Sequence, residues 1–305
     1  MRWEKQGLIY APDGSRDWAV QYAFPPTPHR LSDEVLRIYV AFCDVSTVGR
    51  LGYVDVDPRN PGRVLGVSER PLLDIGQDGA FDENGLLPTS IVQHEGKLYL
   101  YYVGYQLGHK LRYFQFQGLA ISEDGGHSFR RAQRTPVIDR SDAELVNRTS
   151  AFVMRDEGVF KMWYVGGSDW TLARGKSLPV YNMRYLTSDD GVRWGAEGRV
   201  VMDFQSPDEH AFGRPWVLRD SRGYRMFYSV RSHSRGYRLG YAESPDGVTW
   251  TRLDDQVGID VSAKGWDSEM VQYSSVVTVE GRTYMFYNGN NCGQTGFGYA
   301  VLATD

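Results

Sequence analysis

The sequence predicts an all-β protein, a five-bladed β-propeller with four-stranded antiparallel blades in one domain that spans residues 1–305. Three observations lead to this prediction. A turn motif recurs along the chain, strands with alternating apolar residues flank it, and no segment of about 12 residues shows helical periodicity. The spacing predicts a repeat of roughly 60 residues, which is typical of propellers and other repeat folds. Five such units account for the 305 residues.

The recurring motif is a Ser-x-Asp-Gly turn followed by an aromatic residue. It occurs at Ser122–Phe129, Ser188–Trp194 and Ser244–Trp250, each time after an alternating apolar strand. Asp and Gly tolerate the positive φ of tight turns, so the motif predicts a β-hairpin. We expect the aromatic ring to pack back over the turn. The pattern resembles the Asp-box hairpin seen in many β-propellers.

The five predicted units share one plan. They span residues 14–74, 81–139, 142–203, 208–260 and 267–305. The second and third units carry insertions between their second and third strands, at Gly104–Gln117 and Gly166–Val180. The turn of the first unit departs from the Asp-Gly pattern.

The N-terminus supplies a strand that the last unit lacks. The last unit ends with a third strand, Gly298–Leu302, whereas Met1–Tyr10 looks like a fourth, because Trp3 matches Trp194 and Trp250. We therefore expect the N-terminal strand to close the ring. Closure would remove exposed sheet edges, which otherwise pair with other chains.

The composition bears on the partners and the location of the protein. The net charge is −4 without a basic stripe, so nucleic acid and anionic membranes are poor partner candidates. No apolar run is long enough to span a membrane, and Met1–Tyr10 lacks a signal core, so we expect a cytoplasmic location. Cys43 and Cys292 are expected to be free thiols in neighbouring blades. No Cys or His spacing suits a metal, so neither metal nor cofactor is expected.

Polar residues at the predicted first strands are the candidate site, because first strands line the channel of a propeller. An aspartate recurs near the first strand of four units, and the residue six positions after it is compared across the units. The pairs are Asp82 and Pro88, Asp142 and Arg148, Asp208 and Arg214, and Asp267 and Tyr273. An acid that recurs in this way is more often structural, accepting backbone N–H bonds at the strand entry. The residue two positions after each aspartate differs in type from unit to unit, which indicates that each blade contributes a separate role. These residues are Asn84, Glu144, His210 and Glu269.

These side chains predict a site for a sugar or sugar-derived ligand. Guanidinium groups bind carboxylate or phosphate, and amides pair with hydroxyls. The alternative is a network of salt bridges that fills the channel, with most nearby aromatic residues in the core. The predicted ligand-binding residues are Gln21, Glu83, Asn147, Arg148, Trp163, His210, Arg214, Arg231, Asp267 and Asn290.

Three segments carry a family resemblance. They are Gly265–Met270, Tyr284–Asn290 and Thr295–Ala300. With the repeated hairpins and the acids at the first strands, the chain resembles the five-bladed β-propellers of the glycoside hydrolase superfamily that includes arabinanases, invertases and levansucrases. A closer likeness is to uncharacterised glycosidase-like bacterial proteins. The resemblance covers nearly the whole chain.

The resemblance implies a carbohydrate-active enzyme with two carboxyl groups of separated pKa. Hydrolases of this superfamily usually place an aspartate in blade one, a second carboxylate in blade two and a glutamate acid in blade three. Here blade one offers only Gln21. We predict Glu144 as the acid and Glu269, or else Asp82, as the base or nucleophile. The alternatives are a non-hydrolytic sugar-binding or biosynthetic protein that reuses the pocket and, less favoured, a protein-interaction propeller.

Overall fold

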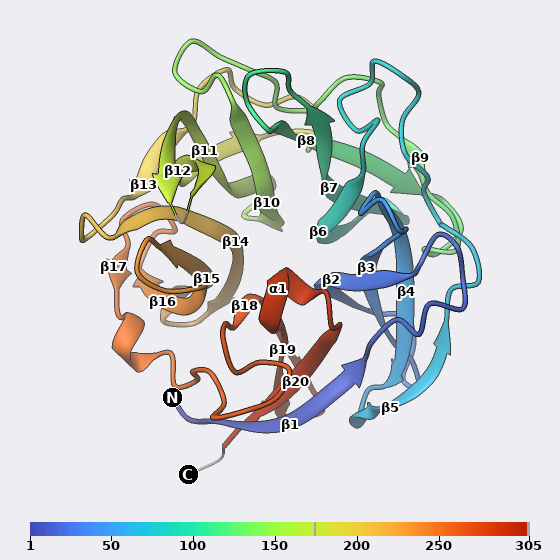
Figure 1. Cartoon of the computed structure of the whole chain (residues 1–305). Coiled ribbons are helices and arrows are strands. Elements are labelled where there is room, and N and C mark those ends of the chain that lie inside the picture. Colours follow the sequence, from blue (N-terminus) through green and yellow to red (C-terminus); the bar gives the residue numbers. More distant parts are fainter. Residues whose placement is uncertain (174, 304–305) are drawn as a thin grey trace.

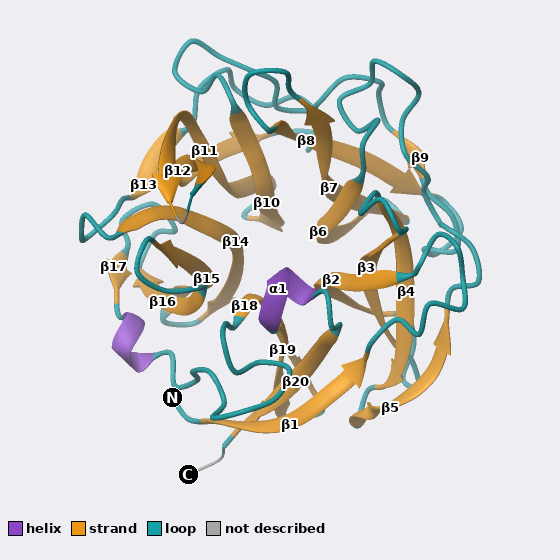
Figure 2. Cartoon of the chain, viewed as in Figure 1, coloured by secondary structure: helices purple, strands orange, loops and turns teal. Residues whose placement is uncertain are grey.

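Antiparallel strands arranged around a common centre make up most of the regular structure of the molecule, and loops connect them (Figures 1 and 2). The computed structural model describes residues 1–173 and 175–303. One four-stranded sheet contains β2 (Gln21–Arg30), β3 (Leu36–Cys43), β4 (Gly49–Asp57) and β5 (Asn60–Val67). A second contains β1 (Trp3–Tyr10), β20 (Phe297–Leu302), β19 (Arg282–Asn288) and β18 (Gln272–Val279).

A twelve-stranded sheet holds the remaining strands in three antiparallel groups. The first group is β6 (Leu86–His94), β7 (Lys97–Leu107), β8 (Tyr113–Ser122) and β9 (Arg130–Arg131). The second is β10 (Asn147–Asp156), β11 (Val159–Ala173), β12 (Lys176–Ser188) and β13 (Arg199–Met202). The third is β14 (Glu209–Asp220), β15 (Gly223–Ser232), β16 (Arg238–Ser244) and β17 (Thr251–Arg252). Short parallel contacts β8–β10 and β12–β14 join the groups, so the count of five separate blades stays a prediction.

Two short helices complete the described elements. A 3₁₀ helix spans Asp254–Gln256, and α1 spans Asn290–Gly293. No helix in residues 1–173 and 175–303 is both long and apolar enough to cross a membrane. The all-β prediction is confirmed.

The N-terminal strand completes the sheet of β18, β19 and β20, as predicted. β1 runs antiparallel to β20, with Trp3 opposite Leu302 and Tyr10 opposite Phe297. The Trp3 ring is buried and meets Phe227 edge to face at 6.1 Å between ring centroids. The first and last strands of the chain therefore hold each other in place.

The two segments predicted as insertions are extensions of the neighbouring strands. β7 and β8 stay paired as far as Leu107 opposite Tyr113. β11 and β12 stay paired as far as Ala173 opposite Lys176. Aromatic and β-branched residues in these segments favour the extended backbone. Residues of both long hairpins line the pocket described below.

The Ser-x-Asp-Gly turns share one hydrogen-bond pattern, seen clearly in the third copy. The Ser244 hydroxyl accepts a bond from the N–H of Gly247 at 2.8 Å, and one Asp246 carboxylate oxygen accepts bonds from the two backbone N–H groups that follow Gly247. These bonds lower the pKa of Asp246. The Trp250 indole donates to the Gly247 carbonyl at 2.9 Å. The aromatic ring thus folds back over the turn as expected.

The innermost strand of each group carries a β-bulge. Register shifts fall between Gln21 and Phe24, Pro88 and Ser90, Thr149 and Phe152, Gly213 and Trp216, and Gln272 and Ser275. Four non-glycine residues at these bulges have positive φ: Tyr22 (61°), Ser150 (55°), Arg214 (26°) and Tyr273 (54°). A bulge redirects a side chain, and such strained backbone persists only where its surroundings enforce it. All four residues line the cavities described next.

Candidate functional site

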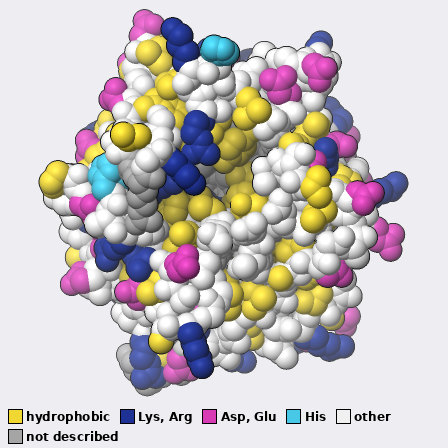
Figure 3. Space-filling view, in the orientation of Figure 1, with side chains coloured by type: hydrophobic (Ala, Val, Ile, Leu, Met, Phe, Trp, Pro, Cys, Tyr) yellow, Lys and Arg dark blue, Asp and Glu magenta, His cyan; other side chains and the backbone are white. Residues whose placement is uncertain are grey.

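A pocket of about 380 Å³ opens at the centre of the molecule, where Figure 3 shows a hollow with dark blue arginine or lysine atoms on one side. Its polar walls are rich in tyrosine. The tyrosines come from all three sheets: Tyr22, Tyr105, Tyr113, Tyr181, Tyr237 and Tyr273. Arg112, Arg231, Asn84, Gln115 and the two cysteines share the lining. Within residues 1–173 and 175–303, no lining residue is Asp or Glu.

The tyrosine hydroxyls are hydrogen-bond donors at neutral pH. Burial raises the pKa of Tyr105, Tyr181 and Tyr273 well above the ordinary value of a phenol. The rings of Tyr237 and Tyr273 lie 5.6 Å apart, and those of Tyr105 and Tyr113 lie 5.8 Å apart. Each ring offers an apolar face and a polar tip, a combination suited to a ligand with both apolar and hydroxyl surfaces.

Two arginines at the pocket have no carboxylate partner. The Arg231 guanidinium lies 5.2 Å from the centroid of the Tyr237 ring, and the nearby Tyr237 raises the pKa of Arg231. The Arg112 guanidinium lies 5.6 Å from the centroid of the Tyr113 ring. Neither forms an ion pair with a residue that the structure describes. The pocket therefore carries positive charge that no carboxylate among the described residues pairs with.

A third arginine, Arg214, lies beneath the pocket and is 1% exposed. It lines a cavity of about 30 Å³ that shares Tyr105, Tyr181, Tyr237 and Tyr273 with the pocket above. Its guanidinium donates to the Tyr273 carbonyl at 2.9 Å, and to two further acceptors on β2 and β6. Burial lowers its pKa to about 9, so the group is charged at pH 7. Its Nε atom is buried without a partner.

The acid predicted for catalysis, Glu144, is fully buried away from this pocket. The Tyr164 hydroxyl lies 2.9 Å from both of its carboxylate oxygens. Nε of Arg148 and Nε of Arg184 lie 3.2 and 3.5 Å from the carboxylate. Two guanidinium groups and a hydroxyl surround this buried carboxylate, so its charge is paired within the protein. This geometry favours a structural role for Glu144.

Asp82 and Asp267 have the same surroundings. Asp82 accepts from the Tyr102 hydroxyl at 3.0 Å and pairs with Arg131 at 2.7 Å. Asp267 accepts from the Tyr287 hydroxyl at 3.0 Å and pairs with Lys5 at 2.7 Å. Both aspartates are held by side chains and not by the backbone N–H bonds expected at the strand entry, and this pairing favours a structural role for them.

The prediction that Glu144 and Glu269 hold the same repeat position is wrong. Glu144, Asp82 and Asp267 each precede their tyrosine partner by 20 residues, so Glu144 is the equivalent of these aspartates. The sequence comparison aligned Asp142, instead of Glu144, with Asp82 and Asp267. The alignment of the third unit was therefore displaced by two residues. The acid–tyrosine spacing is the signal that would have corrected it.

The same slip affected the two predicted ligand-binding arginines. Arg214 is itself a bulge residue, whereas Arg148 precedes the bulge residue Ser150 by two, so the two arginines are not equivalent. Arg148 is 2% exposed and donates to the carbonyl of Asp139 at 2.6 Å, and Asn147 is fully buried beside it. Neither Arg148 nor Asn147 lines the central pocket.

Other predicted site residues have packing or loop roles. Trp163 is completely buried in the core and donates its indole N–H to the Gly247 carbonyl at 2.7 Å, so it has no face free to stack on a sugar. His210 is buried, and its ring centroid lies 4.9 Å from that of His233. Gln21 donates to the carbonyl of Asp44 at 3.1 Å.

Of the remaining predicted residues, Glu83 and Glu269 lie in loops, and Asn290 is the first residue of α1. Glu269 is exposed, and its backbone N–H donates to the Asn290 side-chain oxygen at 2.8 Å. Glu83 accepts from the side chain of Gln106 at 3.3 Å. Of the ten predicted ligand-binding residues, Arg231 lines the central pocket and Arg214 lies beneath it. The tyrosines were missed because no short motif marks them.

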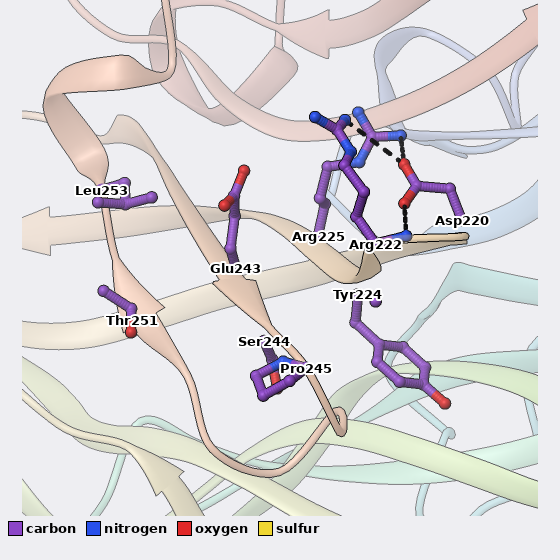
Figure 4. A pocket seen from close by; sticks show the side chains of 10 residues that line it. Asp220, Arg222, Tyr224, Arg225, Glu243, Ser244, Pro245, Thr251 and Leu253 are labelled. Carbon is purple, nitrogen blue, oxygen red and sulfur yellow. Dashed lines mark hydrogen bonds and ion pairs between the residues drawn. The ribbon is translucent and has the colours of Figure 1, made fainter.

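A separate surface hollow of about 370 Å³ lies over β15, β16 and β17 (Figure 4). It contains two carboxylates. Asp220 pairs with Arg225 at 2.9 Å, as the dashed lines in Figure 4 show, and a bond from the Arg222 backbone N–H lowers the pKa of Asp220. Glu243 accepts from the Tyr241 hydroxyl at 2.6 Å. Since both acids are engaged by the protein, this hollow is a weaker candidate than the central pocket.

The described residues hold no cluster of three or more His, Cys, Asp or Glu side chains suited to a metal ion. Cys43 and Cys292 are unpaired thiols that both line the central pocket. Burial raises the pKa of Cys43 to about 12 and raises that of Cys292, so both thiols are protonated at neutral pH.

Comparisons with known proteins agree with the fold. Residues 70–212 match the model of the "Glycosyl hydrolases family 32 N-terminal domain". Among solved structures, a protein described as "Glycoside hydrolase" superposes with a TM-score of 0.75 at 20% identity, covering 99% of this chain and 92% of the other. The β-1,2-mannobiose phosphorylase from Listeria innocua superposes with a TM-score of 0.71 at 10% identity, covering 99% and 97%.

The strands and these matches show the β-propeller fold that glycoside hydrolases also have. The "Uncharacterized protein Rv1502" of Mycobacterium tuberculosis (strain ATCC 25618 / H37Rv) is 36% identical over 302 residues, which cover 99% of each chain. This chain belongs to the family of that protein.

Proposed function

We propose that the protein binds a sugar-derived ligand in its central pocket and does not cleave glycosidic bonds with a pair of carboxylates. The supporting observation is the lining of the pocket: six tyrosines and two arginines, with no Asp or Glu among the described residues. Glycoside hydrolysis ordinarily requires one carboxyl as acid and a second as base or nucleophile. The carboxylates predicted for these roles are buried with cations or lie outside the pocket.

The proposal also covers the number of blades around the pocket and the location of the protein in the cell. The grouping of the strands supports five blades around one channel, with the ring joined through β1 and β20. A cytoplasmic location stays a prediction. It suits the free thiols of Cys43 and Cys292, because disulfides are rare in that compartment.

Binding of sugars and turnover of glycosides test the proposal together. A panel of mono- and disaccharides is titrated by calorimetry, and the same panel plus aryl glycosides is assayed for hydrolysis. We expect binding without turnover. Tyr113→Ala should weaken binding about 2- to 10-fold, since aromatic contacts contribute ~0.5–1.5 kcal/mol, while Tyr113→Phe keeps most of the affinity. Hydrolysis that disappears in Glu144→Gln at unchanged melting temperature would instead establish the carboxylate enzyme.

A further inference from the structure

We infer that the ligand of the central pocket carries an anionic group, a carboxylate or a phosphate, which binds at Arg231. This inference rests on the proposed function and names the class of sugar derivative. Arg231 lies on β15 and shares the pocket wall with Tyr181, Tyr237 and Tyr273, the groups that shift its pKa.

The first argument is the charge balance of the pocket. Arg231 is half-buried and makes no ion pair with any described residue, and Arg112 at the same pocket makes none either. Buried and half-buried cations in proteins are ordinarily paired, because the charge loses hydration. An anionic ligand would supply the missing partner.

The second argument is the surplus of donors over acceptors. Protonated Tyr181, Tyr237 and Tyr273 each donate and accept, and the Tyr237 hydroxyl is hydrogen-bonded to Tyr181 and Tyr273, whereas a guanidinium offers N–H groups only. The side-chain acceptors among the lining amides are those of Asn84 and Gln115. A pocket lining with more hydrogen-bond donors than acceptors suits the oxygens of a carboxylate or phosphate, which only accept. It suits a neutral hydroxyl group less well, because a hydroxyl must also donate.

The third argument is the charge beneath the floor. Arg214 is 1% exposed, is bonded to hydroxyl and carbonyl oxygens and has no carboxylate partner among the residues described. Its Nε is buried and unpartnered. A fixed positive charge below the pocket favours a negative group above it, because charges interact more strongly in a partly buried site than in bulk water.

Titration calorimetry with matched sugars tests the inference. The acidic probes are glucuronate, galacturonate, glucose 1-phosphate and mannose 1-phosphate, and the neutral controls are glucose, galactose and mannose. We expect at least one acidic probe to bind about 10-fold or more tightly than its neutral counterpart, with affinity that falls as salt rises. Preference for the uronates or for the sugar phosphates distinguishes the two anionic groups.

Two variants locate the binding group. Arg231→Gln should weaken the acidic probe about 10- to 100-fold, because a charge-assisted hydrogen bond contributes ~1.5–3 kcal/mol. Arg235→Gln makes the same charge change on an exposed residue outside the pocket lining and should leave affinity unchanged. Equal binding of acidic and neutral sugars, or acidic binding that survives Arg231→Gln, overturns the anionic inference and leaves sugar binding intact. Failure of every sugar to bind refutes the proposed function itself.

Discussion

Replacing Glu144 with glutamine separates the structural role of this acid from the catalytic one. In the structure the carboxylate is fully buried and is held by the Tyr164 hydroxyl at 2.9 Å. Nε of Arg148 and Nε of Arg184 lie 3.2 and 3.5 Å away. Glutamine keeps the shape but removes the negative charge, and its amide NH₂ cannot accept a bond from these donors. Two guanidiniums would then be left in a buried region without their counter-ion.

The expected loss of stability is large enough to measure. Removing one partner of a buried ion pair costs ~3–5 kcal/mol. The entropy of unfolding is ~2.1 cal/mol/K per residue, or about 0.64 kcal/mol/K for a chain of this length. The melting midpoint of Glu144→Gln should therefore fall by about 5–8 °C.

Thermal melting followed by circular dichroism measures this shift. Glu269→Gln is the matched control, because Glu269 is exposed. It should change stability by no more than ~0.5 kcal/mol, or about 1 °C. A Glu144→Gln protein that melts with the wild type would refute the structural reasoning. If that protein had also lost a measured turnover, Glu144 would be catalytic.

Three further predictions concern the fold around the pocket. Arg214→Met should lower the melting midpoint by about 5–14 °C, because three acceptors on β2, β6 and β18 lose a charged donor and buried unsatisfied groups cost ~1–3 kcal/mol each; an unchanged midpoint would show that these bonds add no net stability. Burial lowers the pKa of His210 to about 4, below its unfolded value of 6.5, so the unfolded chain takes up the proton first as pH falls. Stability should therefore drop by up to ~3 kcal/mol between about pH 6.5 and 4, and urea unfolding of His210→Gln should lack this part of the decrease; identical pH profiles would contradict it. Deleting Met1–Tyr10 should destabilise the whole fold, since Trp3 alone contributes ~3–5 kcal/mol of packing, and a truncated protein with the wild-type midpoint would exclude this.

The features that the sequence predicted correctly depend on neighbours in the chain. The Ser-x-Asp-Gly turns form through bonds between residues two to four positions apart, such as Ser244 with Gly247 and Asp246 with Thr249. Alternating apolar residues predict strands because side chains alternate between the faces of a sheet. Trp3 matched Trp194 and Trp250 in the repeat, and this match predicted the pairing of β1 with β20. The turn and strand signals have short range, and the match of Trp3 to the repeat needs only a comparison of segments, so both can be read without knowledge of the fold.

The residues that face the pocket depended on how the strands pack. Counting from Asp142 instead of Glu144 placed Arg148 at the position of Arg214, because the tyrosine partner that identifies Glu144 is 20 residues away. Whether an acid is buried with a cation depends on partners far away in the chain, as for Lys5 and Asp267. The order of residues was sufficient to specify the strands, the turns and the pairing of the first strand with the last. The tyrosine and arginine lining of the pocket emerged only from the folded chain, because a one-residue change of register exchanges the two faces of a strand.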